Sequence, residues 1–585
     1  MSQPDPYVIH LENGQRSSVI LNHIGFNTHG PKTFLVPGSE KAGYSKFELV
    51  DGSGVPVFEG SLVYAGTTAK WSVTPSVWTG DFSAFTSPGV GFRLRLSKSE
   101  TVESAAIVTN GDAESKATKK AKTTTTSTTT RTSTDLVVPD IYHYFRSQRV
   151  SGKYAKKDHR VSFVAAEDGS RPEGTVDVSG GWYDASGDTS KYLSHLSYAN
   201  FMNPQQTPLI TWAFLEAADN LSATAGSSDR LKSFLAPLRE ESLYGCDFLI
   251  RMQHEDGYFY QTVFDKWSKD VNQREIWLKH TTWQAGYRQG AGLAIASLAR
   301  ASTLPSEFIE STTNYSGAIY LAAAEAGFKH LEIHNVSYLN DKTENIIDHY
   351  CALLAASELY AATKNEEYLH AARTRSAKLQ ACQVSNARPF FHASDAGLPI
   401  ISLVRYAEVE TDASLIAAVK VVVERAMDFE ISITKQVNNP FGYPRQYVKP
   451  VDGPARASFF FPHNNESGYW WQGENARLGS LASAASKALS LLAPTLPAEK
   501  TAAYTLWRQS SIDWVLGKNP YDMCMMQGRG RRNPEYLPQY PNAQDEEGDL
   551  AFKPDPHGAD WAQNWRWGEQ WIPHGGYLAL AVSLV

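Results

Sequence analysis

The chain has 585 residues, of which 42% are hydrophobic and 20% are charged, a composition typical of globular proteins with two or more domains. Its formal net charge of −7 provides no electrostatic basis for binding nucleic acid, so we expect no nucleic-acid partner. No apolar run reaches the roughly 18 residues that a membrane span requires, so we expect no membrane partner either.

Cysteine usage and the N-terminal sequence bear on the compartment. The four cysteines are widely spaced and form no Cys-x-x-Cys motif: Cys246, Cys351, Cys382 and Cys524. We therefore expect reduced, partly buried thiols instead of disulfides or a zinc site. The first residues show neither the basic nor the apolar segment of a signal peptide, which favours a cytoplasmic protein. Nothing in the sequence indicates the oligomeric state.

Residues 1–100 consist of short β-rich runs separated by turn signals, which predicts a small all-β sandwich. The expected strands are 17–21, 32–36, 46–50, 55–58 and 91–97. The Asp-Gly-Ser-Gly sequence at 51–54 predicts a hairpin turn. Residues 101–138 are rich in Thr and Lys, and are either a flexible linker or a loop that ends in a final strand.

From about residue 205 onward, apolar residues recur at helical spacing. The clearest segments are 211–219, 243–250, 290–298, 318–325, 350–359, 414–423, 478–485, 504–516 and 577–584. No strand-like alternation interrupts them, which disfavours a parallel α/β fold. We predict a mainly α fold in which residues 139–585 form an (α/α)6 barrel of helical hairpins, with a groove built by the loops at one end.

A glycine-rich stretch at 180–188, Gly-Gly-Trp-Tyr-Asp-Ala-Ser-Gly-Asp, contains two acids, Asp184 and Asp188. Glycine permits tight backbone turns, so this stretch predicts a bent loop that can direct both carboxylates into one cavity. Tyr183 would then supply a flat aromatic wall, as suits a sugar ring. The alternative is a surface turn with two solvated aspartates.

A second acidic candidate lies near the C-terminus, where Glu569 is surrounded in sequence by Trp565, Trp567 and Trp571. Desolvation by such neighbours would hold a proton on Glu569 and suit it to donate that proton. The alternative is an ion pair with Arg566. Hydrolysis of a glycosidic bond requires only two such carboxyl groups, one protonated and one charged. No phosphate loop, zinc motif or nucleophile elbow is present, so we expect no cofactor.

The sequence Tyr-Trp-Trp-Gln-Gly-Glu-Asn at 469–475 combines aromatic and polar residues before a predicted helix. We expect Glu474 or Asn475 to contact the terminal sugar, with Trp470 or Trp471 as a stacking wall. The alternative is helix capping and an aromatic core. Glu466 is a second, lower-ranked candidate for the proton donor.

Three further acids, Asp265, Asp270 and Glu275, raise the question of a metal site. Their spacing matches no recognised calcium loop, so we interpret them as solvated charges and predict no metal ligand. A structural calcium ion is left open.

These motifs together resemble glycoside hydrolase family nine, the inverting cellulase family, whose acid loop reads Gly-Gly-Trp-x-Asp-Ala-Gly-Asp. The resemblance implies that Asp188 is the base that activates water and that Asp184 is its partner. The spacing of Asp560, Trp565 and Glu569 is similar to the family's second signature, which implies that Glu569 is the acid. The Leu-Gly-Lys-Asn-Pro run at 516–520 and the N-terminal sandwich, similar to an immunoglobulin-like domain of one branch, extend the resemblance over most of the chain.

Departures from the cellulase pattern indicate a branch of the family. Ser186 is inserted between the two aspartates, and Gln-Gly-Arg-Gly-Arg-Arg at 527–532 replaces a Pro-His-His-Arg stretch. The Asp-Ala-Ser-Gly-Asp sequence resembles the exo-acting β-glucosaminidase and β-glucosidase branch. We therefore expect an inverting exo-β-glycosidase that releases glucosamine or glucose from the non-reducing ends of chitosan- or cello-oligosaccharides. The alternatives are an endo-β-1,4-glucanase, a non-catalytic carbohydrate-binding protein, and a polysaccharide lyase.

Overall fold

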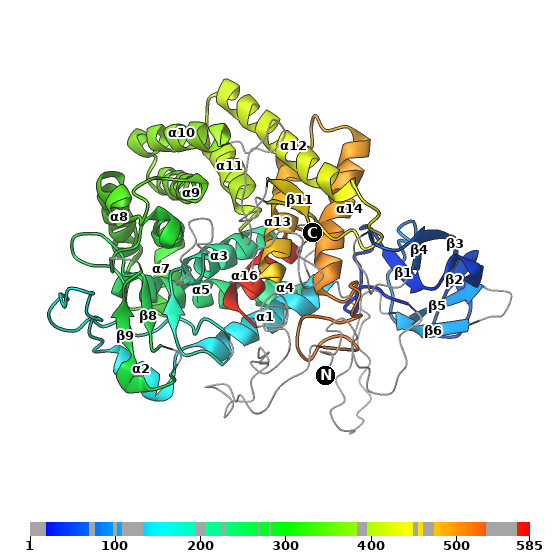
Figure 1. The fold of residues 1–585 in the computed structure, drawn as a ribbon, viewed down its shortest axis with the longest axis horizontal. Coiled ribbons are helices and arrows are strands. Elements are labelled where there is room, and N and C mark those ends of the chain that lie inside the picture. Colours follow the sequence, from blue (N-terminus) through cyan, green and yellow to red (C-terminus); the bar gives the residue numbers. More distant parts are fainter. Residues whose placement is uncertain are drawn as a thin grey trace.

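The computed structural model describes residues 19–69, 76–97, 102–107, 133–185, 187–194, 205–224, 228–266, 268–279, 282–382, 395–448, 454–459, 473–533 and 570–585. The six strands between residues 33 and 107 form an N-terminal domain at one end of the molecule, and the helices form a larger domain beside it (Figure 1). This arrangement confirms the predicted fold class.

The N-terminal domain is an antiparallel sheet with the strand order β1-β4-β3-β2-β5-β6. The strands are β1 (Thr33–Pro37), β2 (Lys46–Val50), β3 (Pro56–Gly66), β4 (Val77–Asp81), β5 (Phe92–Ser97) and β6 (Val102–Ile107). The long strand β3 pairs with β2 and with β4, so it belongs to both halves of the sandwich. Phe92, Leu94 and Leu96 alternate toward the core, as the predicted half-buried strand requires.

The expected strands at 32–36, 46–50, 55–58 and 91–97 are confirmed within one or two residues at their starts. Residues 19–21 differ from the predicted strand at 17–21, because they form only an isolated bridge between Ile20 and Leu35. Strand β6 and the start of helix α1 (Ser133–Gln148) lie within 101–138, whereas the Thr-rich run at 123–130 lies outside the described residues.

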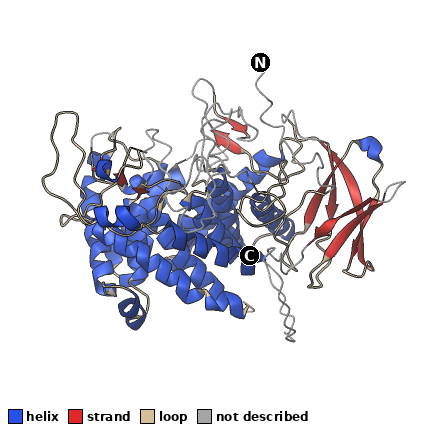
Figure 2. Ribbon diagram, turned by 90° about the horizontal axis from the view of Figure 1, so that it is seen from below, coloured by secondary structure: helices blue, strands red, loops and turns tan. Residues whose placement is uncertain are grey.

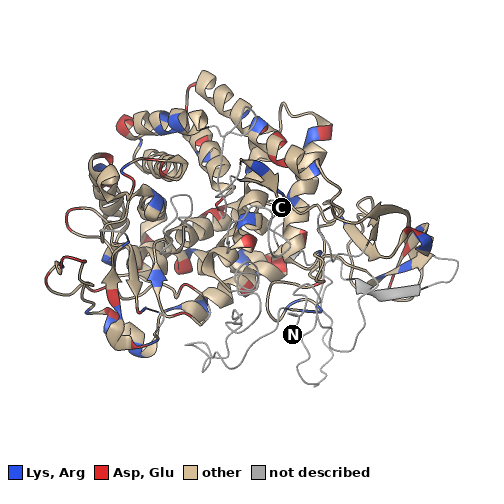
Figure 3. Cartoon of the chain, viewed as in Figure 1, with Lys and Arg blue, Asp and Glu red and all other residues tan. Residues whose placement is uncertain are grey.

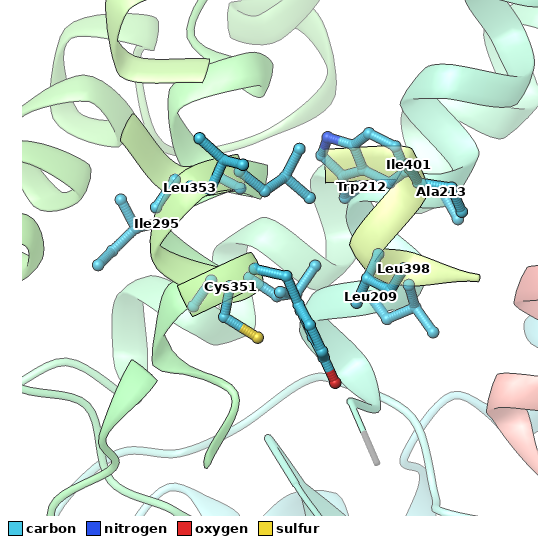
Figure 4. Packing of buried hydrophobic residues seen from close by; sticks show 14 of the residues in the cluster. Leu209, Trp212, Ala213, Ile295, Cys351, Leu353, Leu398 and Ile401 are labelled. Carbon is cyan, nitrogen blue, oxygen red and sulfur yellow. The ribbon is translucent and has the colours of Figure 1, made fainter. Parts of the chain in front are cut away.

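Six inner helices of the described chain form a closed ring in which each packs on the next and the last packs on the first. They are α3 (Thr207–Ala223), α6 (Ala291–Ala301), α9 (Ile346–Thr363), α11 (Leu398–Val409), α13 (Glu474–Leu492) and α16 (Ile572–Ser583). Their side chains meet in one core: Figure 4 shows Leu209 and Trp212 of α3 with Cys351 of α9 and Leu398 of α11. The frequent Ala, Gly and Ser residues of these helices permit their close approach.

Six outer helices pack around this ring, most of them against two neighbouring inner helices, which gives the predicted barrel of helical hairpins. They are α1, α5 (Leu235–Arg251), α8 (Gly317–Tyr338), α10 (Glu366–Ala381), α12 (Ala413–Lys435) and α14 (Ala498–Val515). Shorter elements connect them: α2 (Gly152–Asp158), α4 (Asp229–Ser233), α7 (Ser306–Thr312), η2 (Val271–Gln273), η3 (Tyr287–Gln289), β7 (Lys191–Tyr192), β8 (Thr262–Phe264), β9 (Glu275–Trp277), β10 (Gln446–Val448) and β11 (Arg456–Ser458). The short helix η1 (Glu40–Ala42) lies between β1 and β2 of the N-terminal domain. Within the described ranges, no helix is both long and apolar enough to cross a lipid bilayer.

The inner helices begin at the same end of the barrel, because inner and outer helices alternate along the chain. Figure 2 shows irregular connections and short strands on one side of the helical layer. At the opposite end, Arg300 near the end of α6 bonds Glu216 at 2.6 Å and Glu358 at 3.0 Å. Charges of both signs are interspersed over the described helices (Figure 3), so the ring presents no face of a single sign in that view.

The two domains are joined by side-chain hydrogen bonds to backbone carbonyls and to a carboxylate. Asn438 donates to the carbonyls of Ala65 at 2.6 Å and Thr67 at 2.7 Å. Asn22 donates to Asp513 of α14 at 2.8 Å. Between these contacts the strands β1, β3 and β4 and the helices α12 and α14 leave a cleft of about 510 Å³.

Gly397 at the start of α11 provides a test of the ring packing. A Cβ atom at this position would lie 1.9 Å from the backbone oxygen of Ser480 in α13, so the two helices would have to move apart. We expect Gly397→Ala to lower the free energy of unfolding by about 1–3 kcal/mol, measured as a reduced melting temperature. Gly52→Ala is the matched control, because no heavy atom lies within 4 Å of its Cβ position. Equal melting temperatures for the two variants would contradict the packing described.

Candidate active site

The acid loop is held in place by its glycines and by Trp182. Gly180, Gly181 and Gly187 have φ values of 84°, 73° and 89°, which side chains other than glycine rarely adopt. Trp182 is fully buried and donates its indole N–H to Glu241 of α5 at 2.7 Å. The loop is therefore anchored to the helical core and is not the surface turn that was the alternative.

Beneath the loop lies a buried ionic cluster of Asp158, Lys191 and Arg274. Asp158 bonds Lys191 at 2.7 Å and Arg274 at 2.5 Å, and all three side chains are fully buried. Burial lowers the pKa of Lys191 to about 8, although Asp158 opposes this shift. Lys191 also donates to the carbonyl of Gly180 at 2.8 Å, and Arg274 donates to the carbonyl of Thr189. The cluster thus holds the loop at both ends.

Asp188 is half-buried, and its carboxylate accepts from the backbone N–H groups of Thr189 at 2.6 Å and Ser190 at 3.1 Å. Burial raises its pKa; the N–H of Ser190 opposes this shift and the carboxylate of Asp265 adds to it. A carboxylate with raised proton affinity suits the role of a general base.

Asp265 corrects an expectation, because it is fully buried and not a solvated charge. It accepts from the hydroxyl groups of Thr189 and Ser190, the latter at 3.2 Å, and so supports the loop from below. Asp270 and Glu275 are only partly exposed, and Asp270 caps the short helix η2. Among the described residues, no group of three or more potential ligands could hold a metal ion.

Asp184 joins the acid loop to the segment that follows Glu569 in the sequence. Its Oδ1 accepts from the indole N–H of Trp571 at 2.8 Å and from the side-chain amide of Gln206. Its backbone carbonyl accepts from the N–H of Ile572 at 3.0 Å, and Ala185 forms a bridge with Trp571. Two motifs almost 400 residues apart in the sequence therefore meet.

The predicted sugar-contact motif at 469–475 also lies against Trp571, through Gly473. Gly473 caps α13 with a φ of 83°, and a Cβ there would lie 2.5 Å from the Trp571 ring. Glu474, the next residue, is fully buried and bonds Arg477 at 2.5 Å and the hydroxyl of Tyr443. The alternative interpretation, a core residue at a helix N-terminus, therefore describes Glu474 better than sugar contact.

Asn475 lies with Gln570 and His574 around a small cavity of about 50 Å³, next to the C-terminal motif. This placement keeps Asn475 a candidate for sugar contact. Tyr183 differs from the prediction, because its ring is buried against Val150 and Tyr154. Burial raises the pKa of its hydroxyl to about 12. The expected aromatic wall is thus a core side chain with no open face for a sugar.

Several predicted site residues lie outside the described residues: Ser186, Glu466, Trp470, Trp471, Asp560, Trp565 and Glu569. The residue after Glu569 is firmly placed. The carbonyl of Gln570 accepts from the hydroxyl of Tyr144 at 2.6 Å, and its side chain donates to the carbonyl of Met525 at 3.2 Å. The role of Glu569 stays a prediction.

Sequence reasoning missed three residues that hold the aspartates: Gln206, Asp265 and Trp571. Trp571 was noted only as a neighbour of Glu569, and Asp265 follows a short alternating run at 262–264 that could have indicated a strand end. Gln206 has no local signal, because its contact with Asp184 exists only in the folded ring.

A closed ring of helical hairpins, with Asp184 bonded at the N-terminal ends of two inner helices, fits the architecture expected of a glycoside hydrolase. Residues 136–557 match the profile of glycosyl hydrolase family 9, and residues 14–101 match the profile of the cellulase N-terminal ig-like domain. The chain belongs to glycosyl hydrolase family 9 and is a glycosidase.

Individual relatives are distant. A xyloglucan-specific endo-β-1,4-glucanase of Bacteroides ovatus is 24% identical over 555 residues, which are 89% of this chain and 82% of that protein. A cellodextrinase of Butyrivibrio fibrisolvens is 25% identical over 259 residues, which are 42% of this chain and only 39% of the cellodextrinase.

Solved structures share the fold over nearly the whole chain. A family 9 protein of Bacteroides ovatus has a TM-score of 0.63 at 20% identity, covering 97% of this chain and 98% of its own. A single mutant of a thermostable endoglucanase from Alicyclobacillus acidocaldarius has a TM-score of 0.62 at 16% identity, covering 97% of this chain and 100% of its own.

The ionic cluster beneath the acid loop generates a prediction. Arg274→Met removes donors from Asp158 and from the Thr189 carbonyl while Asp158 keeps its pair with Lys191, so we expect a loss of about 1–3 kcal/mol of stability and a fall in kcat. Arg300→Met is the control, because it breaks buried ion pairs at the other end of the ring and should reduce stability without reducing kcat. Both are assayed at a temperature at which circular dichroism shows them folded. An unchanged kcat in Arg274→Met would show that the ionic cluster does not affect catalysis.

Proposed function

We propose that this glycosidase is an inverting enzyme that cleaves β-1,4-linked glucosyl chains, with Asp188 as base, Asp184 as its partner and Glu569 as acid. The observation that carries the proposal is the bond between Asp184 and Trp571, which brings the acid loop to the segment two residues beyond Glu569. This contact supports the assignment of residues from two distant motifs to one site.

The proposed reaction is a single displacement. Asp188 accepts a proton from a water molecule whose oxygen forms the new bond to the anomeric carbon, while Glu569 gives its proton to the departing glycosidic oxygen. The raised proton affinity of Asp188 supports its role, because a base with a higher pKa accepts the water proton more readily. Attack on the face opposite the leaving group inverts the anomeric configuration.

For the sugar, we favour glucose over glucosamine. Glucosamine carries a cationic amine, which a nearby carboxylate would favour, and Glu474 is the carboxylate that the sequence predicts at the terminal sugar. That carboxylate is fully buried and bonded to Arg477 and Tyr443. It is therefore not available to bind the amine of glucosamine. The names of the two relatives, a cellodextrinase and a xyloglucan endoglucanase, also refer to glucose-based chains.

For the mode of cleavage, we propose release of glucose from non-reducing ends, on the basis of the inserted Ser186 in the acid loop. The second candidate is an endo-β-1,4-glucanase. It is favoured by the Bacteroides ovatus relative, whose similarity extends over 89% of this chain.

The first test of the proposal is Glu569→Gln. The amide has no acidic proton to give to the leaving oxygen, so we expect kcat on cello-oligosaccharides to fall by at least about a hundredfold while KM changes little. Near wild-type kcat would remove Glu569 from the reaction. A proton NMR time course on the wild-type enzyme should show the α-anomer first, and initial β-anomer would contradict inversion.

The second test compares substrates and products. We expect glucose to be released from cellobiose and cellotetraose, with far slower hydrolysis of the glucosamine dimer. Early formation of glucose and cellotriose in equal amounts from cellotetraose supports exo cleavage, and early formation of cellobiose supports the endo candidate. Faster hydrolysis of the glucosamine dimer would overturn the preference for glucose.

A further inference from the structure

We propose that Gln206 and Trp571 are positioning residues for Asp184, which they hold between the starts of two inner helices. The inference rests on the proposed function, since it takes Asp184 as a residue of the reaction. Gln206 is the N-cap residue of α3 and Trp571 is the N-cap residue of α16. Both use their side chains to bond Asp184 and not their own helix.

The geometry of the contact explains its effect on orientation. The indole N–H of Trp571 lies 2.8 Å from Oδ1 of Asp184, and the amide of Gln206 donates to the same oxygen. Two donors on one oxygen fix the rotation of a carboxylate about its Cβ–Cγ bond. All three side chains are buried, with Gln206 at 0% and Trp571 at 1% exposure, so water does not compete with these bonds.

The donors also match the charge of the carboxylate. Gln206 and Trp571 are neutral, so they bond an anion without forming an ion pair that would weaken its action on other groups. The N-terminal ends of α3 and α16 carry partial positive charge, which adds to the stabilisation of a carboxylate between them.

The same contact links the two sides of the proposed reaction centre. The N–H of Ile572 bonds the backbone carbonyl of Asp184 at 3.0 Å, so Asp184 is tied to the C-terminal segment through both backbone and side chain. The segments around Gln206 and α16 are tied again by Asp395. This carboxylate accepts from the N–H of Gln205 at 3.3 Å and from the hydroxyl of Tyr577 in α16 at 2.9 Å.

Trp571→Phe and Gln206→Met test the inference, because each removes the N–H donor. Gln206→Met approximately keeps the volume of the side chain, and the volume that Trp571→Phe loses is matched by its control. We expect kcat on cello-oligosaccharides to fall at least about tenfold in each variant with KM within about twofold of wild type, because misplaced catalytic groups slow chemistry more than binding.

Trp212→Phe is the matched control. Trp212 is fully buried in α3 and donates its indole N–H to Glu358 at 2.9 Å, so the variant loses the same kind of bond away from Asp184. We expect it to lose stability to a similar extent and to keep wild-type kcat. If Trp212→Phe and Trp571→Phe lose kcat equally, the loss reflects general destabilisation, and the inference is overturned.

Gln206→Glu adds a second measurement, the pH dependence of kcat, which would not change if Gln206 had a purely structural role. When protonated, the introduced carboxyl group can donate to Asp184, whereas its ionised form repels it. We expect the ratio of variant to wild-type kcat to rise as the pH falls toward the usual pKa of glutamic acid, about 4.3. A ratio that does not change with pH would count against positioning by Gln206.

Asp184→Asn separates the failure of this inference from failure of the proposed function. If Asp184→Asn retains kcat, Asp184 is not part of the reaction and the proposed roles fail. If Asp184→Asn loses kcat while Trp571→Phe and Gln206→Met keep it, the roles stand and the positioning inference alone is overturned.

Discussion

The indole of Trp571 is the contact on which the arrangement of the site depends. Its N–H bonds Asp184 of the acid loop, and its ring lies against Gly473 at the start of α13. Its backbone begins α16, the helix that closes the ring by packing between α13 and α3. Three motifs from different parts of the sequence therefore meet at one side chain. Glycine at 473 is required there because any Cβ would overlap the ring.

Closure of the ring also determines where the site can form. The inner helices begin at the same end, and the N-termini of α3 and α16, with partial positive charge, flank Asp184. Gln206 caps α3, yet its amide bonds Asp184 instead of its own helix. The N-terminal ends of the inner helices thus form one end of the barrel, and two of them also hold Asp184 in place.

The acid loop depends on buried charge as well as on helix ends. Asp158, Lys191 and Arg274 are fully buried, which is costly unless every charge is paired. Their pairing is close, and Lys191 and Arg274 also bond loop carbonyls. A loop rich in glycine would otherwise have many conformations. The cluster therefore restricts the loop to one conformation, in which Asp188 lies above Asp265.

The sequence by itself determined the two-domain organisation, the inner helices except α11 (Leu398–Val409), and the acid loop, because apolar periodicity and glycine spacing are local properties. It indicated the outer helices less well: the helix Glu366–Ala381 was not predicted, since its surface is mostly polar and its pattern weak. Only the tertiary structure decided that Glu474 bonds Arg477, that Tyr183 is a core residue and that Asp265 supports the loop. Such contacts join residues distant in sequence, and they exist only once the ring of helices has closed.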